Sequence, residues 1–264
     1  MSVSLLAKKK RKGEKISVVT CYDWSFARIL NATNVDALLV GDSAAMVMQG
    51  HSETAKMTLS AMTFFVESVA RGAPNKFIIA DIPFGWAHKD GSAFIGAISD
   101  LVHAGAQAIK IEGVGLQNEN IARAIDAGVP VAGHLGLTPQ HINKLGGYRL
   151  QGKTDAKAEL IRDQVVQLQD LGCFAVVLEC VTSETARIVQ DISDRIVTIG
   201  IGAGDTTDGQ VMVLQDLLGM TLGRTPRFVR KFSNLAELSG DAVNDFVSAV
   251  QSGGYPSAGE SYNQ

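Results

Sequence analysis

The feature that most constrains the fold of this chain is a regular alternation between short apolar runs and longer amphipathic segments. Runs of strand length, rich in Val, Ile and Leu, begin at Ile16, Asp36, Phe77, Ala108, Val129, Phe174 and Ile196. A weaker eighth run begins at Gln210. Short, continuously apolar runs are typical of strands buried on both faces of a parallel sheet.

Helix-like segments lie between these runs, at 59–71, 91–104, 118–127, 155–171 and 182–191. Glycine follows several of them, at Gly72, Gly105, Gly128 and Gly172, as expected where helices end. Repeated strand–helix units predict a parallel sheet, and about eight units favour a closed (β/α)8 TIM barrel, an α/β fold. An open doubly wound sheet is the alternative, although no Gly-x-Gly-x-x-Gly motif follows the first run.

No linker rich in Pro, Gly or Ser interrupts the series, so we predict one catalytic domain over residues 1–264. A short N-terminal helix is expected over about 1–14 and a polar C-terminal tail over about 254–264. Hydrophobic residues make up 46% of the chain, enough for a sizeable core. The basic run 8–12 is interpreted as a solvated helix face, in preference to a nuclear-import or RNA-binding patch.

Charge and cysteine content narrow the partners and the compartment. The formal net charge of -3 gives no indication of a nucleic-acid or membrane partner. No apolar run is long enough to span a bilayer, and the N-terminus has the reverse order of a secretory signal. Three cysteines without paired spacing argue against a disulfide framework. A cytoplasmic location is therefore expected.

Ionisable and polar side chains gather at the ends of successive apolar runs. In chain order they are Asp42, Ser43, Asp81, Lys110, Glu112, His134 and Glu179. Lys110 and Glu112 are two residues apart on one strand, so their side chains point to the same side. In a closed barrel these strand ends meet at one face, which is where barrel enzymes have their active sites.

Each of these residues also has a purely structural interpretation. Asp42 and Asp81 could cap the turns that follow them, Lys110 and Glu112 could form a structural ion pair, and His134 could be a hydrogen-bonded core histidine. The joint pattern favours an active site, because independent caps and pairs would not need to share one rim.

A hard divalent cation such as Mg²⁺ suits this group of carboxylates. Asp42 and Asp81 are the expected ligands, with Glu112 beside them or acting through water. A 2-keto acid could chelate the ion, which would stabilise an enolate. Lys110 and His134 could hold the substrate carboxylate and the developing negative charge, and Glu179 could act as the catalytic general base.

The glycine-rich segment 200–210 follows the seventh run. It could bind phosphate, but it lacks the Gly-Lys-Ser/Thr of a P-loop. We interpret it as a tight turn at the barrel rim where a ligand approaches the backbone.

Several longer motifs resemble ketopantoate hydroxymethyltransferases (3-methyl-2-oxobutanoate hydroxymethyltransferases). The motifs are GDSAAMVMQGH from Gly41, ADIPFG from Ala80, IKIEG from Ile109, GHLGLTPQ from Gly133, GGYRLQGK from Gly146, LEC from Leu178 and GIGAGDTTDGQ from Gly200. They occur in the family's order between about Lys15 and Asn234.

The resemblance implies a transferase with a barrel of the phosphoenolpyruvate mutase/isocitrate lyase type. Such enzymes transfer a hydroxymethyl group from 5,10-methylenetetrahydrofolate to 3-methyl-2-oxobutanoate, giving 2-dehydropantoate for pantothenate and coenzyme A biosynthesis. The resemblance further implies Mg²⁺, a homo-oligomer (commonly a decamer), and keto-acid contacts from Asp42, Ser43, Asp81 and Lys110 with His134 nearby. Asp42, Asp81 and Glu112 would surround the metal, and Glu179 would be the base.

The chain departs from the family pattern at three places, Ala44-Ala45, 52–56 and 86–90. All three are expected on loops at the active face. Two other functions are weighed against this one. A carbon–carbon lyase or mutase of the isocitrate lyase/phosphoenolpyruvate mutase superfamily would share the barrel, but its lid-cysteine stretch is absent. A non-catalytic barrel would not be expected to keep the whole acidic set.

Overall fold

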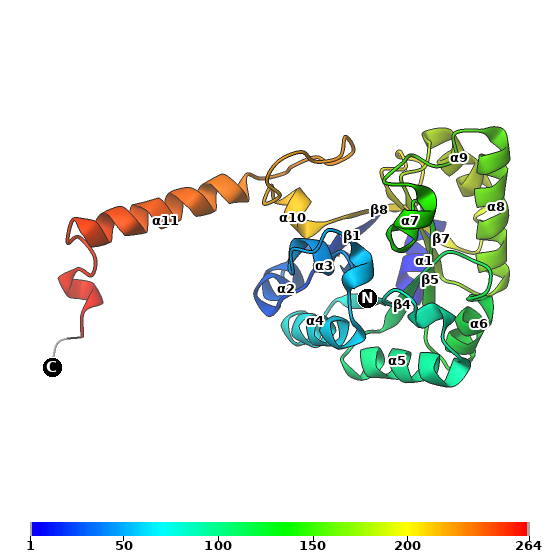
Figure 1. Ribbon diagram of the computed structural model, residues 1–264, viewed down its shortest axis with the longest axis horizontal. Helices are drawn as coiled ribbons and strands as arrows, with labels where there is room; N and C mark the ends of the chain where they lie inside the picture. The colour runs from blue at the N-terminus through cyan, green and yellow to red at the C-terminus, as the bar shows by residue number, and fades with distance from the viewer. Residues whose placement is uncertain (1, 263–264) are drawn as a thin grey trace. The chain divides into compact units, whose positions relative to one another are not determined.

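Eight parallel strands form a closed barrel in the order in which they occur in the chain (Figure 1). The strands are β1 Ile16–Thr20, β2 Ala37–Val40, β3 Phe77–Asp81, β4 Ala108–Glu112, β5 Val131–Gly136, β6 Ala175–Glu179, β7 Val197–Ile201 and β8 Gly209–Met212. The computed structural model describes residues 2–262. The predicted barrel is confirmed, including its weak eighth strand.

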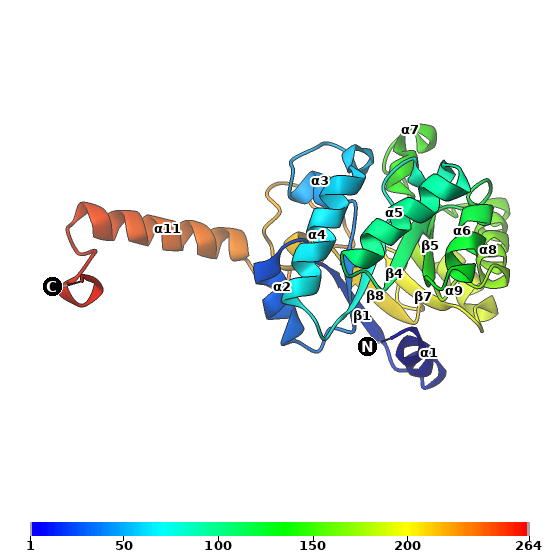
Figure 2. The same ribbon diagram turned by 90° about the horizontal axis from the view of Figure 1, so that it is seen from below.

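Helices alternate with the strands and surround the barrel (Figure 2). They are α1 Val3–Arg11, α2 Trp24–Asn31, α3 Ala44–Val47, α4 Leu59–Gly72, α5 Gly91–His103, α6 Asn118–Asp126, α7 Ile142–Leu145, α8 Asp155–Asp170 and α9 Ser183–Ile192, with 3-10 turns η1 Thr54–Lys56, η2 Trp86–His88 and η3 Pro139–His141. Side chains of Asp23, Thr58, Asp90 and Thr182 accept hydrogen bonds from the first free N–H groups of α2, α4, α5 and α9. The five helices predicted between the strands agree with the observed ones to within one residue at each end, whereas the N-terminal helix is shorter than the predicted 1–14.

Three of the four glycines predicted to follow helices have the left-handed backbone of a helix terminus, namely Gly105, Gly128 and Gly172. Gly72 differs, because it is the last residue of α4 itself. A Cβ on Gly72 would lie 2.6 Å from the Cβ of Ala27 and 2.7 Å from the carbonyl oxygen of Trp24. Glycine is therefore required there by the close packing of α4 against α2.

The barrel interior is filled by alternate residues of the strands, since successive side chains of a strand point to opposite faces. The buried apolar cluster contains Ile16, Val18, Ala37, Leu39, Phe77, Ile79, Ala108, Ala132, Ala175, Val177, Val197, Ile199 and Val211. Leu6 of α1 joins this cluster and is 3% exposed. The interior is therefore a packed core, and α1 closes it at the N-terminal ends of the strands.

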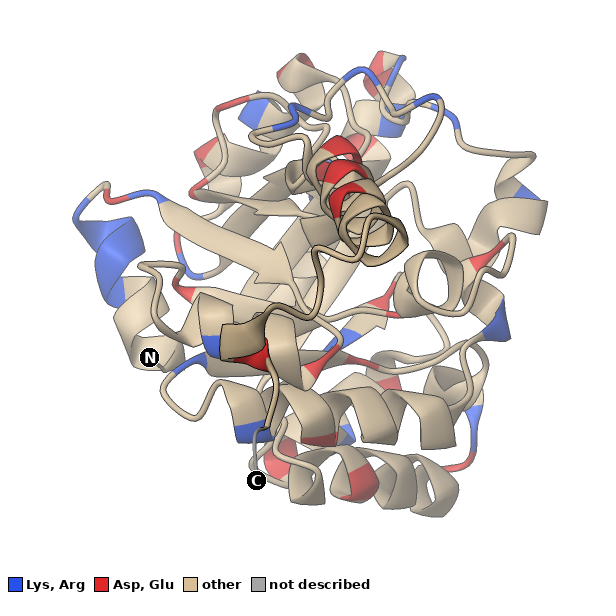
Figure 3. Cartoon of the chain, turned by 90° about the vertical axis from the view of Figure 1, so that its left-hand side faces the viewer, with Lys and Arg blue, Asp and Glu red and all other residues tan. Residues whose placement is uncertain are grey.

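The basic residues of α1 bind the barrel, so the interpretation of 8–12 as a solvated face is wrong for two of them. Lys9 Nζ lies 2.6 Å from Asp36 Oδ1, and Lys10 Nζ lies 2.6 Å from Asp208 Oδ2. Figure 3 shows the basic turn of α1 in blue beside the acidic ends of the neighbouring strands. The partners are far away in the sequence, which is why the pattern of the run alone did not reveal them.

The second half of the glycine-rich segment 200–210 is also held by α1 and β7. No helix separates β7 from β8. The carboxylate of Asp208 accepts hydrogen bonds from the backbone N–H and the hydroxyl of Thr198, and Lys15 donates to the carbonyl oxygen of Thr207. The prediction of a ligand-binding rim turn is thus wrong for residues 207–208, which lie near the start of β8.

The chain divides into two compact units, residues 1–213 and residues 214–264. The second unit contains α10 Leu214–Leu217, α11 Leu235–Gln251 and η4 Ala258–Glu260. The 3-10 turn η4 lies within the predicted polar tail. The last two residues of that tail, Asn263 and Gln264, lie outside the described residues. The single-domain assignment of 1–264 stays a prediction. Among residues 2–262, no helix has the length and apolar character needed to cross a bilayer.

The contact between Lys9 of α1 and Asp36, just before β2, predicts how the stability of the fold depends on pH. Asp36 accepts hydrogen bonds from Lys9 and from the backbone and hydroxyl of Ser17. Burial raises the pKa of Asp36, but these bonds outweigh it and leave the pKa below its ordinary value. The carboxylate therefore stabilises the fold above the unfolded-state pKa of about 4, and this contribution is lost as pH falls through the lower folded-state pKa.

We expect Asp36→Asn to lower the free energy of unfolding at pH 7 by about 2 kcal/mol, because a charged acceptor of three hydrogen bonds is removed. Urea denaturation between pH 7 and pH 3 should show the difference from wild type shrinking below about pH 4. Asp194→Asn, at a largely exposed carboxylate, serves as the control. A pH-independent difference would contradict the role given to the Asp36 charge.

Candidate active site

Along β3, β4 and β5, every second side chain points into the barrel. Those in the core are apolar, and the next ones towards the carboxyl ends are ionisable and form a layer above the core. Asp81 follows Ile79 on the inner face of β3, and His134 follows Ala132 on that of β5. Asp81 is the register partner of Lys110, and Glu112 is the register partner of His134. The structure therefore brings these four side chains together at the carboxyl ends of adjacent strands, as predicted.

Lys110 is the buried cation of this layer, with a side chain that is 5% exposed. Its Nζ lies 3.0 Å from Asp81 Oδ1, 3.2 Å from His134 Nδ1 and 4.0 Å from Glu112 Oε1. Burial lowers the pKa of Lys110, but Asp81, Glu112 and Asp42 outweigh it and raise the pKa. Lys110 is therefore a permanent positive charge in the site, and its main partner is Asp81, in place of the simple pair with Glu112 weighed from the sequence.

His134 lies between two carboxylates. Its Nδ1 is 3.2 Å from Glu112 Oε1, and its Nε2 is 3.3 Å from Glu179 Oε2, although this second contact is not an aligned hydrogen bond. Burial and Lys110 lower the pKa of His134, whereas Glu112 and Glu179 raise it, with a net value of about 9. The ring is thus an imidazolium at neutral pH, linking Glu179 to the other acids.

Asp42 extends the acidic group from β2. Its backbone N–H donates to Asp81 Oδ2 over 2.9 Å. Burial, together with the charges of Asp81 and Glu112, raises the pKa of Asp42 well above its ordinary value. The capping alternative for Asp42 is wrong, because Ser43 is the residue that precedes α3 and no side chain caps that helix.

Gln140 joins the site and was missed by the sequence analysis. Its side-chain Nε2 donates to Asp42 Oδ2 over 2.8 Å and to the carbonyl oxygen of Ile82 over 2.9 Å. Its backbone N–H donates to Glu112 Oε2 over 3.0 Å. One residue thus fixes two of the predicted metal-site carboxylates. The only signal for it was its place at the end of the motif GHLGLTPQ.

Tyr22 is a second residue that the sequence analysis missed. It lies just after β1, is 1% exposed, and its hydroxyl is 2.8 Å from Ser43 Oγ. Burial raises the pKa of Tyr22, so the phenol is neutral. It therefore fixes the hydroxyl of Ser43, one of the predicted substrate contacts.

Glu179 is more accessible than the other acids, with 19% of its side chain exposed. The next residue, Cys180, has a φ of 47°, a left-handed backbone that non-glycine residues rarely adopt. Its N–H donates to Ile201 and its carbonyl accepts from Gln151. Opposite, a Cβ on Gly136 would lie 2.3 Å from the carbonyl oxygen of Glu179. The chain is thus constrained on both sides of the predicted base.

The donor set fits Mg²⁺ with two protein ligands better than with three. Among residues 2–262 no three His, Cys, Asp or Glu side chains converge into a ready-made metal cage. Glu112 already accepts from Gln140 and contacts His134. Asp81 Oδ1 is buried without an aligned hydrogen bond, and its neighbour is Lys110 Nζ at 3.0 Å. Mg²⁺ usually needs only one or two carboxylates, completed by water and substrate oxygens. Asp42 and Asp81 can supply these, with Glu112 in an outer position.

A closed parallel barrel whose strand ends carry a buried lysine, a charged histidine and several carboxylates defines a (β/α)8-barrel enzyme. The sequence model of the family "Ketopantoate hydroxymethyltransferase" matches residues 1–258. The chain is 49% identical over 248 residues to a 3-methyl-2-oxobutanoate hydroxymethyltransferase of Coxiella burnetii, covering 94% of this chain and 93% of the relative. It is 43% identical over 256 residues to the enzyme of that name from Francisella tularensis, covering 97% of each. The chain belongs to the ketopantoate hydroxymethyltransferase family and is an enzyme, a transferase.

Solved structures of other enzymes share the fold. A phosphonopyruvate hydrolase, crystallised with oxalate and Mg²⁺, is 11% identical with a TM-score of 0.64, covering 98% of this chain and 93% of its own. A 2,3-dimethylmalate lyase, described as a phosphoenolpyruvate mutase/isocitrate lyase superfamily member, is 17% identical with a TM-score of 0.60, covering 96% of this chain and 84% of its own. At these identities the similarities show that the closed barrel fold is shared with these enzymes.

The contacts of Gln140 predict that it positions the acidic group. We expect Gln140→Ala to weaken Mg²⁺ binding in the presence of the keto acid about tenfold or more, because Asp42 loses its hydrogen-bond donor. Isothermal titration calorimetry measures this, and Gln167→Ala, at an exposed position of α8, is the control. A dissociation constant within twofold of wild type would show that Gln140 does not position Asp42.

Proposed function

We propose that this enzyme transfers a hydroxymethyl group from 5,10-methylenetetrahydrofolate to 3-methyl-2-oxobutanoate, giving 2-dehydropantoate in pantothenate and coenzyme A biosynthesis. The observation that carries the proposal is the layer of Lys110, His134 and buried carboxylates that ends at the accessible Glu179. The names of relatives that align over nearly the whole chain support the same reaction.

The side chains of the layer match the chemistry of a small 2-keto acid. The substrate is an anion at its carboxylate and gains negative charge at its keto oxygen when it enolises. Lys110 and the imidazolium of His134 supply fixed positive charge next to that place, and Ser43, held by Tyr22, supplies a hydroxyl. When Mg²⁺ is bound, held by Asp42 and Asp81, it would withdraw electrons from the keto acid and acidify its C3 proton.

Glu179 is the proposed catalytic base that removes the proton from C3 of the keto acid. It is the one acid of the layer that is both partly exposed and in contact with His134. The resulting enolate carbon forms a bond to the one-carbon unit of the folate donor, and water supplies the hydroxyl oxygen. Both carbon–nitrogen bonds of the one-carbon unit break, and tetrahydrofolate leaves with its two nitrogens protonated, one by the proton taken from C3 and one by the water. A proton on Glu179 can be shared with His134, which lies 3.3 Å away.

The first test isolates this proton transfer. We expect wild-type enzyme with Mg²⁺ to exchange the C3 proton of 3-methyl-2-oxobutanoate with deuterium, without folate, and Glu179→Gln to be slower by about 10³-fold. NMR follows the exchange directly. Glu184→Gln, at an exposed carboxylate on α9, should exchange at the wild-type rate.

Removing the metal with EDTA should also abolish exchange, because the substrate carbonyl is then no longer polarised. Exchange that is unaffected by Glu179→Gln would assign the base to another residue. No exchange in any form, even with tetrahydrofolate added, together with turnover of isocitrate or 2-methylisocitrate, would overturn the proposed function in favour of a lyase.

We also propose that the enzyme is a cytoplasmic homo-oligomer, with a decamer as the expected size. The three free cysteines suit a reducing compartment. In α11 no residue is buried, and Leu238, Val243, Phe246, Val247 and Val250 are exposed. Glu237, Asp241 and Asp245 recur every four residues, so they lie on a different face of the helix from Val243, Phe246, Val247 and Val250. Exposed apolar faces of this kind usually mark protein contacts.

Light scattering coupled to size-exclusion chromatography tests the oligomer. We expect the wild type to be larger than a monomer and Phe246→Asp, which places a charge among the apolar side chains of α11, to shift towards smaller species. Asp245→Asn, the neighbouring change on the acidic face, is the control. A wild type of 28.0 kDa in solution would contradict the proposal.

A further inference from the structure

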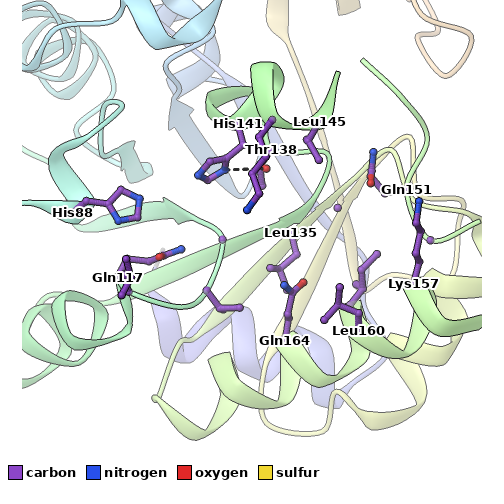
Figure 4. Close-up of a pocket in the computed structure, with 17 residues that line it drawn as sticks. His88, Gln117, Leu135, Thr138, His141, Leu145, Gln151, Lys157, Leu160 and Gln164 are labelled. Atoms are coloured by element: carbon purple, nitrogen blue, oxygen red, sulfur yellow. Dashed lines mark hydrogen bonds between the residues drawn. The ribbon is translucent and has the colours of Figure 1, made fainter. Parts of the chain in front are cut away.

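A cavity of about 540 Å³ lies between the outer side of β5 and the first turns of α8 (Figure 4). Loops that follow β4 and β5 form its other walls. Its size is that of a pocket for a drug-sized ligand, larger than a metal ion or small anion needs. None of the roles assigned to the residues inside the barrel uses this cavity.

The lining of the cavity is apolar on one side and basic on the other. Leu135, Leu145, Leu160 and Ile161 supply apolar surface, and Leu160 is 57% exposed. The basic side chains are His88, His141, Lys144 and Lys157, which come from η2, η3, α7 and α8. No Asp or Glu is among the lining residues. This chemistry suits an organic anion with an aromatic or aliphatic body.

The cavity and the active site adjoin the same strand ends. Gly113, in its wall, directly follows Glu112, and Gly136 is the register partner of Glu179. Gln117, another lining residue, donates to the carbonyl oxygen of Glu112 over 3.0 Å. A ligand in the cavity would therefore lie against the strand ends that carry two of the catalytic-layer acids.

We propose that this cavity binds the benzoyl-glutamate part of the folate donor. The inference rests on the proposed function, since it assumes that the one-carbon donor is a folate. The benzoyl ring would pack on Leu135 and Leu160, and the glutamate carboxylates would pair with Lys144 and Lys157. The end of the donor that carries the one-carbon unit would then have to reach from the cavity to Glu179. His88 belongs to the segment 86–90, one of the places where this chain departs from its family.

Steady-state kinetics test the assignment. We expect Lys144→Ala/Lys157→Ala to raise the KM for methylenetetrahydrofolate about tenfold, as two charge-assisted contacts of roughly 0.7 kcal/mol each would give, with kcat changed less than twofold. Lys153→Ala, which removes the same charge from an exposed neighbour outside the lining, is the matched control. The advantage of a triglutamyl donor over a monoglutamyl donor should shrink only in the double variant.

A second variant tests the role of the apolar side of the cavity. Leu160→Glu places a carboxylate where the donor's own anionic tail would lie, and we expect it to raise the same KM more than Val166→Glu, an exposed change elsewhere on α8. p-Aminobenzoyl-glutamate should inhibit wild type competitively against the donor. Inhibition that is not competitive would overturn the assignment and make the cavity an effector site.

Deuterium exchange of the keto acid, measured without donor, separates the two proposals. A KM within twofold of the Lys153→Ala control in both cavity variants, with exchange and transfer present in wild type, would overturn the cavity assignment and leave the proposed function standing. Absence of both exchange and transfer in wild type would overturn the proposed function, and this inference with it.

Discussion

The structure of the active layer depends on one buried cation, Lys110. Burying an ammonium group without partners costs several kcal/mol, so it needs compensating charge close by. Asp81 lies 3.0 Å from it, and Glu112 and His134 complete its surroundings. Asp81 and His134 come from the neighbouring strands β3 and β5, where the register pairs Asp81 with Lys110 and His134 with Glu112. Glu112 lies two residues further along β4 itself. Replacing Lys110 would leave Asp81 buried without its positive partner.

The layer contains more carboxylates than positively charged side chains, and this excess explains why it suits a metal ion together with an anionic substrate. Asp42, Asp81, Glu112 and Glu179 outnumber Lys110 and the imidazolium of His134. Burial, and then the charges of Asp81 and Glu112, raise the pKa of Asp42. A divalent cation would relieve this repulsion between carboxylates and would also supply the charge that holds a 2-keto acid. Gln140 holds both Asp42 and Glu112, the first with its side chain and the second with its backbone N–H.

The parts of the structure that could be predicted from the sequence are those that local periodicity determines. Apolar runs and helix-like segments predicted the barrel, and strand alternation placed Asp81, Lys110 and His134 in one layer. The residues that were missed depend on contacts between distant parts of the chain. Gln140 binds Asp42 across 98 residues, and Lys10 binds Asp208 across 198. A polar residue in a loop has no periodicity to mark it, so neither partner could be inferred before the register of the barrel was known.

The two proposed ligands depend on different kinds of structure. The keto acid would be held by side chains on strands, whose positions are fixed by hydrogen bonding across the barrel and by the packed core beneath. The donor tail would be held by η2, α7 and α8, outside the barrel wall. Changes in such loops leave the strand register untouched. A change in the segment 86–90 would therefore be expected to alter the binding of the donor and to leave the layer around Lys110 intact.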